Sequence, residues 1–287
     1  MRLIDLHTHS TASDGTFSPS ELAVKAAKTG ISVLALTDHD SVLGCMEAKE
    51  KCNELGIKFI PGVEISAAEH KKMHILGLGI DPSFPSLHDK LDMLKNERMI
   101  CAKRICNILK ELNYNISFDE VLNEAGNSSI GKPHIAKILL QNGEISSIEE
   151  AFEKIFSIPE IRSLKKTKLW AAQAISLIHE AGGMAVLAHP YQMKKSSDEL
   201  HDVIKDLKNA GLDGIECWYA KHTPEMLEEY LGYAKEFGLY TSIGSDFHGT
   251  NKPGTELGTG ISGSLLELRN IYDFDESVIT AIENKNY

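Results

Sequence analysis

Short apolar runs recur along this chain, and polar residues of metal-binding type follow or interrupt many of them. The runs at 2–4, 31–36, 184–188 and 239–243 suit strands, and segments with helical periodicity separate them. This alternation predicts an α/β fold with a mostly parallel sheet closed as a barrel. Because side chains that act on ligands lie at the carboxyl ends of such strands, we expect one site at that face.

The segment Asp5-Leu6-His7-Thr8-His9 shows the pattern first. Its two histidines are two residues apart, so on a strand both imidazoles point to the same side. Imidazole suits zinc, manganese, iron or nickel, although two surface histidines at a chain end would give the same short pattern. The rest of the chain must decide between these interpretations.

Later runs add candidate ligands. Glu64 interrupts an apolar strand pattern and His74 lies between apolar neighbours. A buried Glu is costly unless it is paired or bound to metal, and the alternative is an edge strand on which Glu64 faces water. For His74 the alternative is a hydrogen-bonded packing role. The full candidate set is His7, His9, Asp14, His39, Glu64, His74, His189, Asp246 and His248.

Six histidines and three carboxylates in such positions predict a site for two or three metal ions. Glu64 has two carboxylate oxygens, so it could bridge two ions. A cluster of cations with an open face suits phosphate-ester hydrolysis by a metal-activated hydroxide.

Residues 86–168 have a different sequence pattern from the rest of the chain, because they contain no strand-like apolar runs. Helical patterns cover 87–112, 118–125, 133–141 and 148–155, and they predict an all-helical insertion. Pro133 suits a first helical position, which places Lys132 and His134 at a helix N-terminus, a natural anion site. We expect these two side chains to bind substrate phosphate, with a solvated helix face as the alternative.

Charge and cysteine content narrow the partners and the compartment. The net charge of −11 argues against a general nucleic-acid or membrane binder, and the segment 88–170 carries almost none of that charge. The five cysteines form no Cys-x-x-Cys pair, which indicates reduced thiols and a cytoplasmic protein. We also expect no signal peptide and no membrane span.

Five motifs in order resemble those of the PHP (polymerase and histidinol phosphatase) superfamily. They are Asp5-Leu-His7-Thr-His9-Ser, Thr37-Asp38-His39-Asp40, Pro61-Gly62-Val63-Glu64, Ala188-His189-Pro190 and Gly244-Ser245-Asp246-Phe247-His248. The resemblance implies a distorted (β/α)7 barrel made of residues 1–85 and 169–287. Residues 86–168 would then be a helical subdomain that caps the active site.

The resemblance also implies a distribution of ligands over three ions, with manganese expected and iron or zinc as alternatives. The first ion would be bound by His7, His9, Glu64 and Asp246, the second by Asp14, His39 and His248, and the third by Glu64, His74 and His189.

Further motifs narrow the branch. Ser13-Asp14-Gly15-Thr16-Phe17-Ser18-Pro19, Gly131-Lys132-Pro133-His134 and Gly214-Ile215-Glu216 resemble the 3′,5′-nucleoside bisphosphate phosphatase and 5′→3′ oligoribonuclease branch. Lys132 stands where that branch would have arginine, and lysine lacks the bidentate fork. The resemblance implies hydrolysis of small nucleotides or of the 5′ ends of short RNA, without a stable complex with long nucleic acid.

Two other functions remain open. One is a phosphatase for a non-nucleotide phosphomonoester such as histidinol phosphate, although the Cys-Pro-His-Gly motif of those enzymes is missing near Asp14. The other is a non-catalytic, metal-stabilised module, which a large open cluster disfavours because structural sites are closed by four ligands. His222 is a candidate general acid, and Trp218 and Tyr219 could stack on a base. The oligomeric state is not predicted.

Overall fold

The computed structural model describes residues 3–126, 129–164 and 167–265. They form two compact units, Met1–Asp89 with Lys168–Tyr287 and Lys90–Thr167, each of which is described by itself. The second unit lies within the insertion predicted at 86–168. The sequence also predicts a last helix over 276–283, which lies outside the described residues.

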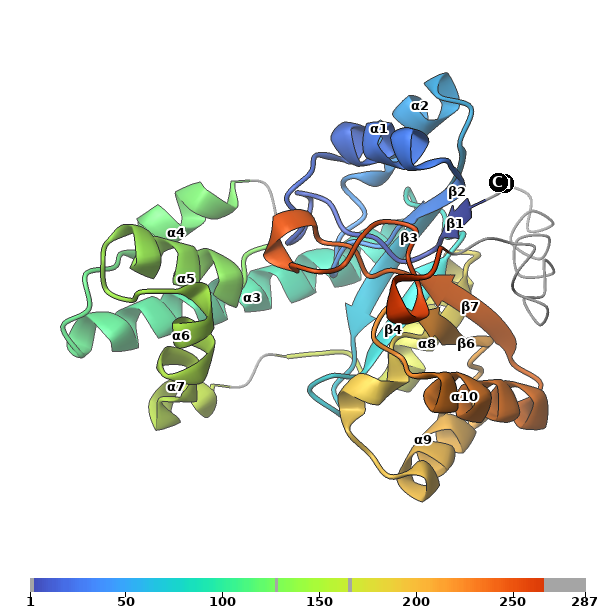
Figure 1. Ribbon diagram of the computed structural model, residues 1–287. Helices are drawn as coiled ribbons and strands as arrows, with labels where there is room; N and C mark the ends of the chain where they lie inside the picture. The colour runs from blue at the N-terminus through green and yellow to red at the C-terminus, as the bar shows by residue number, and fades with distance from the viewer. Residues whose placement is uncertain (1–2, 127–128, 165–166, 266–287) are drawn as a thin grey trace. The chain divides into compact units, whose positions relative to one another are not determined.

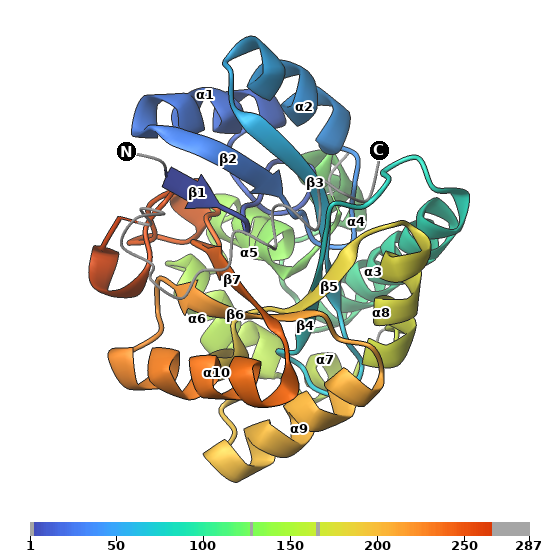
Figure 2. The same cartoon turned by 90° about the vertical axis from the view of Figure 1, so that its right-hand side faces the viewer.

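Seven strands of the first unit form one sheet in the order β1 to β7, curled into a barrel (Figure 2). Between β7 and β1 the barrel is nearly closed: the Leu6 N–H donates to the Ile243 carbonyl at 3.1 Å, and Thr8 bridges to Phe247. The distorted seven-stranded barrel is therefore confirmed. The strands are β1 (Leu3–Asp5), β2 (Ile31–Leu36), β3 (Lys58–Ser66), β4 (His74–Leu78), β5 (Met184–Leu187), β6 (Gly214–Tyr219) and β7 (Tyr240–Gly244).

One strand departs from the parallel arrangement. β4 runs antiparallel to both β3 and β5, whereas the other neighbouring pairs are parallel. The connection 67–73 is too short for a crossover helix, so β3 and β4 form a hairpin. His74 is thus the first residue of its strand, which corrects the expectation that the ligands follow carboxyl ends. Because β4 is reversed, its amino end lies at the same mouth.

Five helices lie outside the barrel (Figure 2): α1 (Pro19–Thr29), α2 (Cys45–Glu54), α8 (Ala171–Glu180), α9 (Ser197–Asn209) and α10 (Pro224–Phe237). Local sequence explains their ends. The sequence Ser18-Pro19-Ser20-Glu21 predicts a capping box, and Ser18 and Glu21 form it at the start of α1. Gly30 ends that helix at φ 86°. Three short 3₁₀ turns follow strands: η2 (Pro190–Met193) comes after β5, and η3 (Gly249–Asn251) and η4 (Ile261–Gly263) come after β7.

Apolar packing holds these helices on the barrel. Leu22 and Ala26 of α1 are fully buried with Leu34 of β2 and Ala48 of α2 in one cluster.

No helix connects β3 to β4. A cavity of about 870 Å³ borders β3 and the segment after β4, lined by α2, that segment and the residues after α8. None of the predicted site residues lines this cavity.

The described residues of the second unit contain helices and no strand (Figure 1). Their core includes Ile105, Leu109, Val121, Ile135 and Leu139, all buried. The helices are α3 (Pro85–Glu111), which begins in the first unit, α4 (Phe118–Ala125), α5 (Lys132–Gln141), α6 (Ile148–Glu153), η1 (Ile155–Ser157) and α7 (Pro159–Arg162).

Two whole-chain expectations can be compared with the structure. All five cysteines are buried and none forms a disulfide. Among the described residues, no helix is both long enough and apolar enough to cross a membrane.

Candidate metal centre

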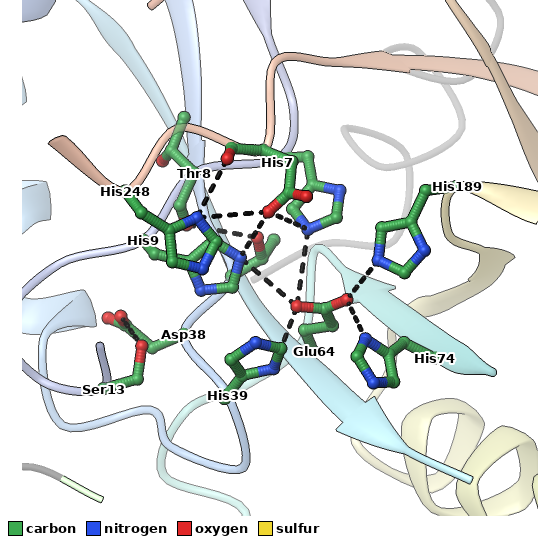
Figure 3. A network of polar contacts seen from close by, with 12 residues as sticks. His7, Thr8, His9, Ser13, Asp38, His39, Glu64, His74, His189 and His248 are labelled. Atoms are coloured by element: carbon green, nitrogen blue, oxygen red, sulfur yellow. Dashed lines mark hydrogen bonds and ion pairs between the residues drawn. The ribbon is translucent and has the colours of Figure 1, made fainter. Parts of the chain in front are cut away.

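The barrel mouth gathers every candidate ligand predicted from the sequence. Figure 3 labels Glu64 and the six histidines among them. Four overlapping groups of the candidate ligands have ligand atoms within 4.8 Å of one another. The groups are His9, Asp14, His39 and His248; His7, His9 and Asp246; His7, Glu64 and His189; and His39, Glu64 and His74.

Glu64 lies between two sets of histidines, one at each carboxylate oxygen (Figure 3). Its Oε1 is 2.7 Å from His74 Nδ1 and 2.9 Å from His189 Nε2. Two oxygens that face different histidines give the geometry required for a bridging carboxylate. The other oxygen, Oε2, is 3.0 Å from His39 Nδ1, 3.2 Å from His9 Nε2 and 3.4 Å from His7 Nε2.

Two aspartates complete the cluster. Asp246 Oδ1 lies 3.4 Å from His9 Nε2 and 3.2 Å from His248 Nδ1. Asp14 Oδ1 lies 3.3 Å from His248 Nε2, and Asp14 Oδ2 is 4.0 Å from His39 Nε2. His248 therefore stands between the two aspartates, with one ring nitrogen toward each.

Buried polar atoms that make no hydrogen bond test whether these nine side chains fit metal ions. His7 Nε2, His9 Nε2 and Glu64 Oε2 are buried and make no hydrogen bond with a described residue. Buried polar atoms left in this way cost free energy unless something else satisfies them. Imidazole nitrogens and carboxylate oxygens that converge on one place are the ligands that bind a divalent cation. The donor set fits.

The charges of the cluster support one another. Burial opposes a charged Glu64, but the positive fields of His39, His74 and His7 hold the pKa of Glu64 well below its ordinary value. Burial likewise opposes a charged His7, but Glu216, Glu64 and Asp246 raise the pKa of that imidazole well above its ordinary value. The centre is therefore a strongly coupled set of carboxylates and imidazoles.

Three buried carboxylates outside the candidate set hold the ligands in place. Asp38 accepts hydrogen bonds from Ser10 Oγ at 2.7 Å and Ser13 Oγ at 2.6 Å, which fixes the loop that leads to Asp14. Asp5 accepts from Ser245 Oγ at 2.6 Å, tying β1 to the segment that carries Asp246. Burial raises the pKa of Asp5 to about 6. The third carboxylate, Glu216, accepts from the His189 N–H at 2.7 Å.

Backbone geometry at the mouth is unusual. Asp40, His189 and Asp246 have φ angles of 49°, 28° and 56°, in the left-handed region that non-glycine residues rarely adopt. Strain of this kind concentrates at functional sites, where the surrounding contacts enforce it. Two of these residues are candidate ligands.

Other predicted residues are placed differently. His222 is buried, and its Nδ1 donates to the Cys217 carbonyl at 2.8 Å. Burial lowers the pKa of His222 to about 4. The ring is therefore neutral near pH 7 with its proton on Nδ1, which does not favour His222 as a general acid. Trp218 and Tyr219 are also buried, which does not favour base stacking.

Lys132 and His134 lie in the second unit. They lie at the predicted helix N-terminus, but α5 begins one residue earlier than predicted, so they occupy its first and third positions and Pro133 the second. His134 Nδ1 accepts from the Gly131 N–H at 3.1 Å. Lys132 Nζ lies 4.6 Å from the centre of the Phe156 ring. Their contact with substrate stays a prediction.

Two lysines near the centre were missing from the sequence prediction. Lys252 Nζ bonds to Asp246 Oδ2. Lys72 lies in the β3–β4 connection, and the charges of Lys252, Asp246 and Glu64 act on its pKa. Sequence separation hid Lys72, since the hairpin that brings it to the mouth was not predicted.

Comparison with known proteins gives the following matches. The PHP domain family model matches residues 5–231. A 5′-3′ exoribonuclease from Haemophilus influenzae is 36% identical over 245 residues, covering 85% of this chain and 89% of that protein. A 3′,5′-nucleoside bisphosphate phosphatase from Chromobacterium violaceum is 33% identical over 260 residues, covering 90% and 91%. The solved structure of a Chromobacterium violaceum amidohydrolase with bound sulfate and no metal has a TM-score of 0.83 and 31% identity, covering 98% and 96%.

Proposed function

The chain belongs to the PHP domain family, and from that premise we propose that it hydrolyses phosphate esters of small nucleotides at a site for two or three divalent cations. The observation that carries this proposal is the position of Glu64, whose two oxygens each face a different set of buried histidines. An enclosed structural site with four ligands would not need such a bridge.

We assign the ligands to three sets, two of which share Glu64. When bound, divalent cations supply Lewis-acid activation of water and neutralise charge on phosphoryl oxygens. Manganese is the proposed metal, with iron or zinc as alternatives. Following the family resemblance, the proposed sets are His7, His9, Glu64 and Asp246; Asp14, His39 and His248; and Glu64, His74 and His189.

The substrate class follows from the two relatives and from charge. One relative is named for a nucleoside bisphosphate and the other for RNA cut from its 5′ end. Both names point to a terminal phosphate of a nucleotide. The net charge of −11 opposes stable binding of a long polyanion. We therefore propose 3′,5′-bisphosphates and short 5′-phosphorylated RNA as substrates.

The test compares matched substrates with manganese-loaded protein. A nucleoside 3′,5′-bisphosphate and a short RNA with a free 5′ phosphate should be hydrolysed, whereas the same RNA with a blocked 5′ end should not. Equal rates on the two RNAs, or internal cuts in a circular RNA, would contradict an end-directed enzyme.

Histidinol phosphate serves as the non-nucleotide competitor in the same assay. If it is turned over faster than every nucleotide, the protein is instead a phosphatase for a non-nucleotide phosphomonoester. Glu64→Gln supplies the blank, because loss of the bridging charge should remove both activities.

A further inference from the structure

Lys252 occupies a special place beside the metal centre. Its Nζ bonds to Asp246 Oδ2 and lies 3.1 Å from the Tyr219 hydroxyl, which itself donates to Asp246 Oδ2 at 2.8 Å. The other oxygen of Asp246 faces His9 and His248. One carboxylate therefore separates the histidine cluster from the lysine.

The ammonium of Lys252 is both accessible and incompletely used. Its side chain is 22% exposed, whereas Asp246 is 3% exposed. An ammonium group has three N–H donors, and the hydrogen bonds of Nζ to described residues are those to Asp246 and Tyr219. A third donor remains for a ligand that enters from solvent.

The loop that carries Lys252 is anchored to the same centre. The Asn251 side chain donates to the Asp14 carbonyl at 2.8 Å, and the Thr250 N–H donates to Thr16 Oγ1 at 3.1 Å. The lysine is therefore held relative to a candidate metal ligand. A side chain positioned in this way loses less entropy when it binds a ligand.

The positive charges at this place indicate that the ligand is an anion. A lysine bonded to a carboxylate that also faces a cation site places positive charge beside positive charge. The repulsion between the lysine and the bound cations is offset when an anion contacts both of them.

We infer that Lys252 binds a phosphate oxygen of the substrate through the third donor of its ammonium group, beside the metal centre. The inference rests on the proposed function, and it adds a phosphate-binding residue from the barrel itself to those expected in the insertion. The lysine would recognise a terminal phosphate dianion, which carries more charge than an internal diester.

The test uses metal-loaded protein and inorganic phosphate as the probe. Calorimetric titration should show phosphate affinity at least about tenfold weaker in Lys252→Met, because a charge-assisted hydrogen bond is lost. Bound metal, measured by elemental analysis, should equal that of the wild type. KM for the nucleotide should rise, and Lys252→Arg should recover most of the affinity. Lys28→Met removes the same charge from the exposed end of α1 and should behave as wild type.

Other outcomes separate this inference from the proposed function. Unchanged phosphate affinity in Lys252→Met would overturn the inference alone, and loss of metal would do the same by showing that the lysine only supports Asp246. Wild-type protein that binds no phosphate would overturn the proposed function as well. If the Met variant does not fold, Lys252→Gln gives the same readout, because it keeps N–H donors for Asp246 and Tyr219 without the charge.

Discussion

The carboxylate of Glu216 accepts a hydrogen bond from Nδ1 of His7 at 3.0 Å, and both side chains are completely buried. The bond fixes the imidazole so that Nε2 faces Glu64 and Asp246. A carboxylate behind a metal-binding histidine sets its tautomer and raises its basicity. The pair thus supports the first proposed ligand of the centre without touching the metal itself.

Glu216→Gln should weaken metal binding by about 10- to 100-fold, the usual effect of removing such a support. The amide lacks the negative charge, and its NH₂ would face the His189 N–H that Glu216 now accepts. Competition with a calibrated chelator measures the change. Glu54→Gln, on an exposed side chain, is the matched control. Equal affinities in both variants would show that His7 needs no carboxylate behind it.

Glu64→Ala should release more metal than His74→Ala, because each oxygen of Glu64 faces a separate set of histidines. Hydrolysis should fall at least about 100-fold, since an ion that neutralises transition-state charge supplies several kcal/mol. Elemental analysis and nucleotide turnover measure the two effects. Removing all metal from the wild type with a chelator should abolish hydrolysis, and activity that survives in metal-free protein would refute the metal centre.

Gly244 permits the close approach of β7 to His7. A methyl group at this position would lie 2.2 Å from His7 Cβ and 2.7 Å from Glu216 Oε1. Gly244→Ala should therefore displace His7, lowering both the free energy of unfolding and metal affinity.

Gly232 in α10 provides the matched control for that variant. No atom lies within 4 Å of a methyl group there, so Gly232→Ala should stabilise the fold by roughly 0.5–1 kcal/mol through helix propensity. Chemical denaturation measures both variants. A Gly244→Ala protein as stable and as metal-rich as the wild type would show that the strand end can shift.

Lys132→Ala should raise KM for nucleotides and leave metal content unchanged, because the lysine is expected to contact phosphate from the N-terminus of α5. Lys103 makes a comparable contact with an aromatic ring, 5.9 Å from the Phe118 centre, in the same unit. Lys103→Ala is therefore the control for lost packing and charge. Normal kinetics in Lys132→Ala, or lost metal, would refute the phosphate contact.

The elements that local sequence specifies could be predicted well. β2 and α4 have the predicted bounds, and α1 has its predicted cap, because periodicity and capping act over a few residues. The direction of β4 was also within reach of the sequence. Its seven-residue connection to β3 excludes a crossover helix, and that length alone implies a hairpin.

The supporting contacts of the site could not be predicted in the same way. Glu216 is 209 residues from His7, and the bond exists only because the barrel brings β6 beside the end of β1. Lys252 is six residues from Asp246, yet its contact depends on the turn η3 folding the chain back. Ligand types could be read from residue chemistry, whereas partners of ligands required the fold.

His222 should make stability depend on pH. Its folded-state pKa of about 4 lies below the ordinary value of 6.5, because burial disfavours the charged ring. Between these values the unfolded chain binds more protons at this residue than the folded chain does, so the free energy of unfolding falls as pH falls. The contribution lost between about pH 6.5 and pH 4 is up to about 3 kcal/mol.

The measurement compares wild type with His222→Gln, both metal-free, by denaturant unfolding from pH 7.5 to pH 4. Groups common to both proteins cancel, so the wild type should lose more stability on acidification. His201→Gln is a control of opposite sign, because the hydrogen bond that His201 donates to Glu236 raises the pKa of this half-buried imidazole. What His201 contributes is present below pH 6.5 and is lost as pH rises through its folded-state pKa. Parallel curves for wild type and His222→Gln would show that burial does not lower the pKa of His222, and this would return it to consideration as a proton donor.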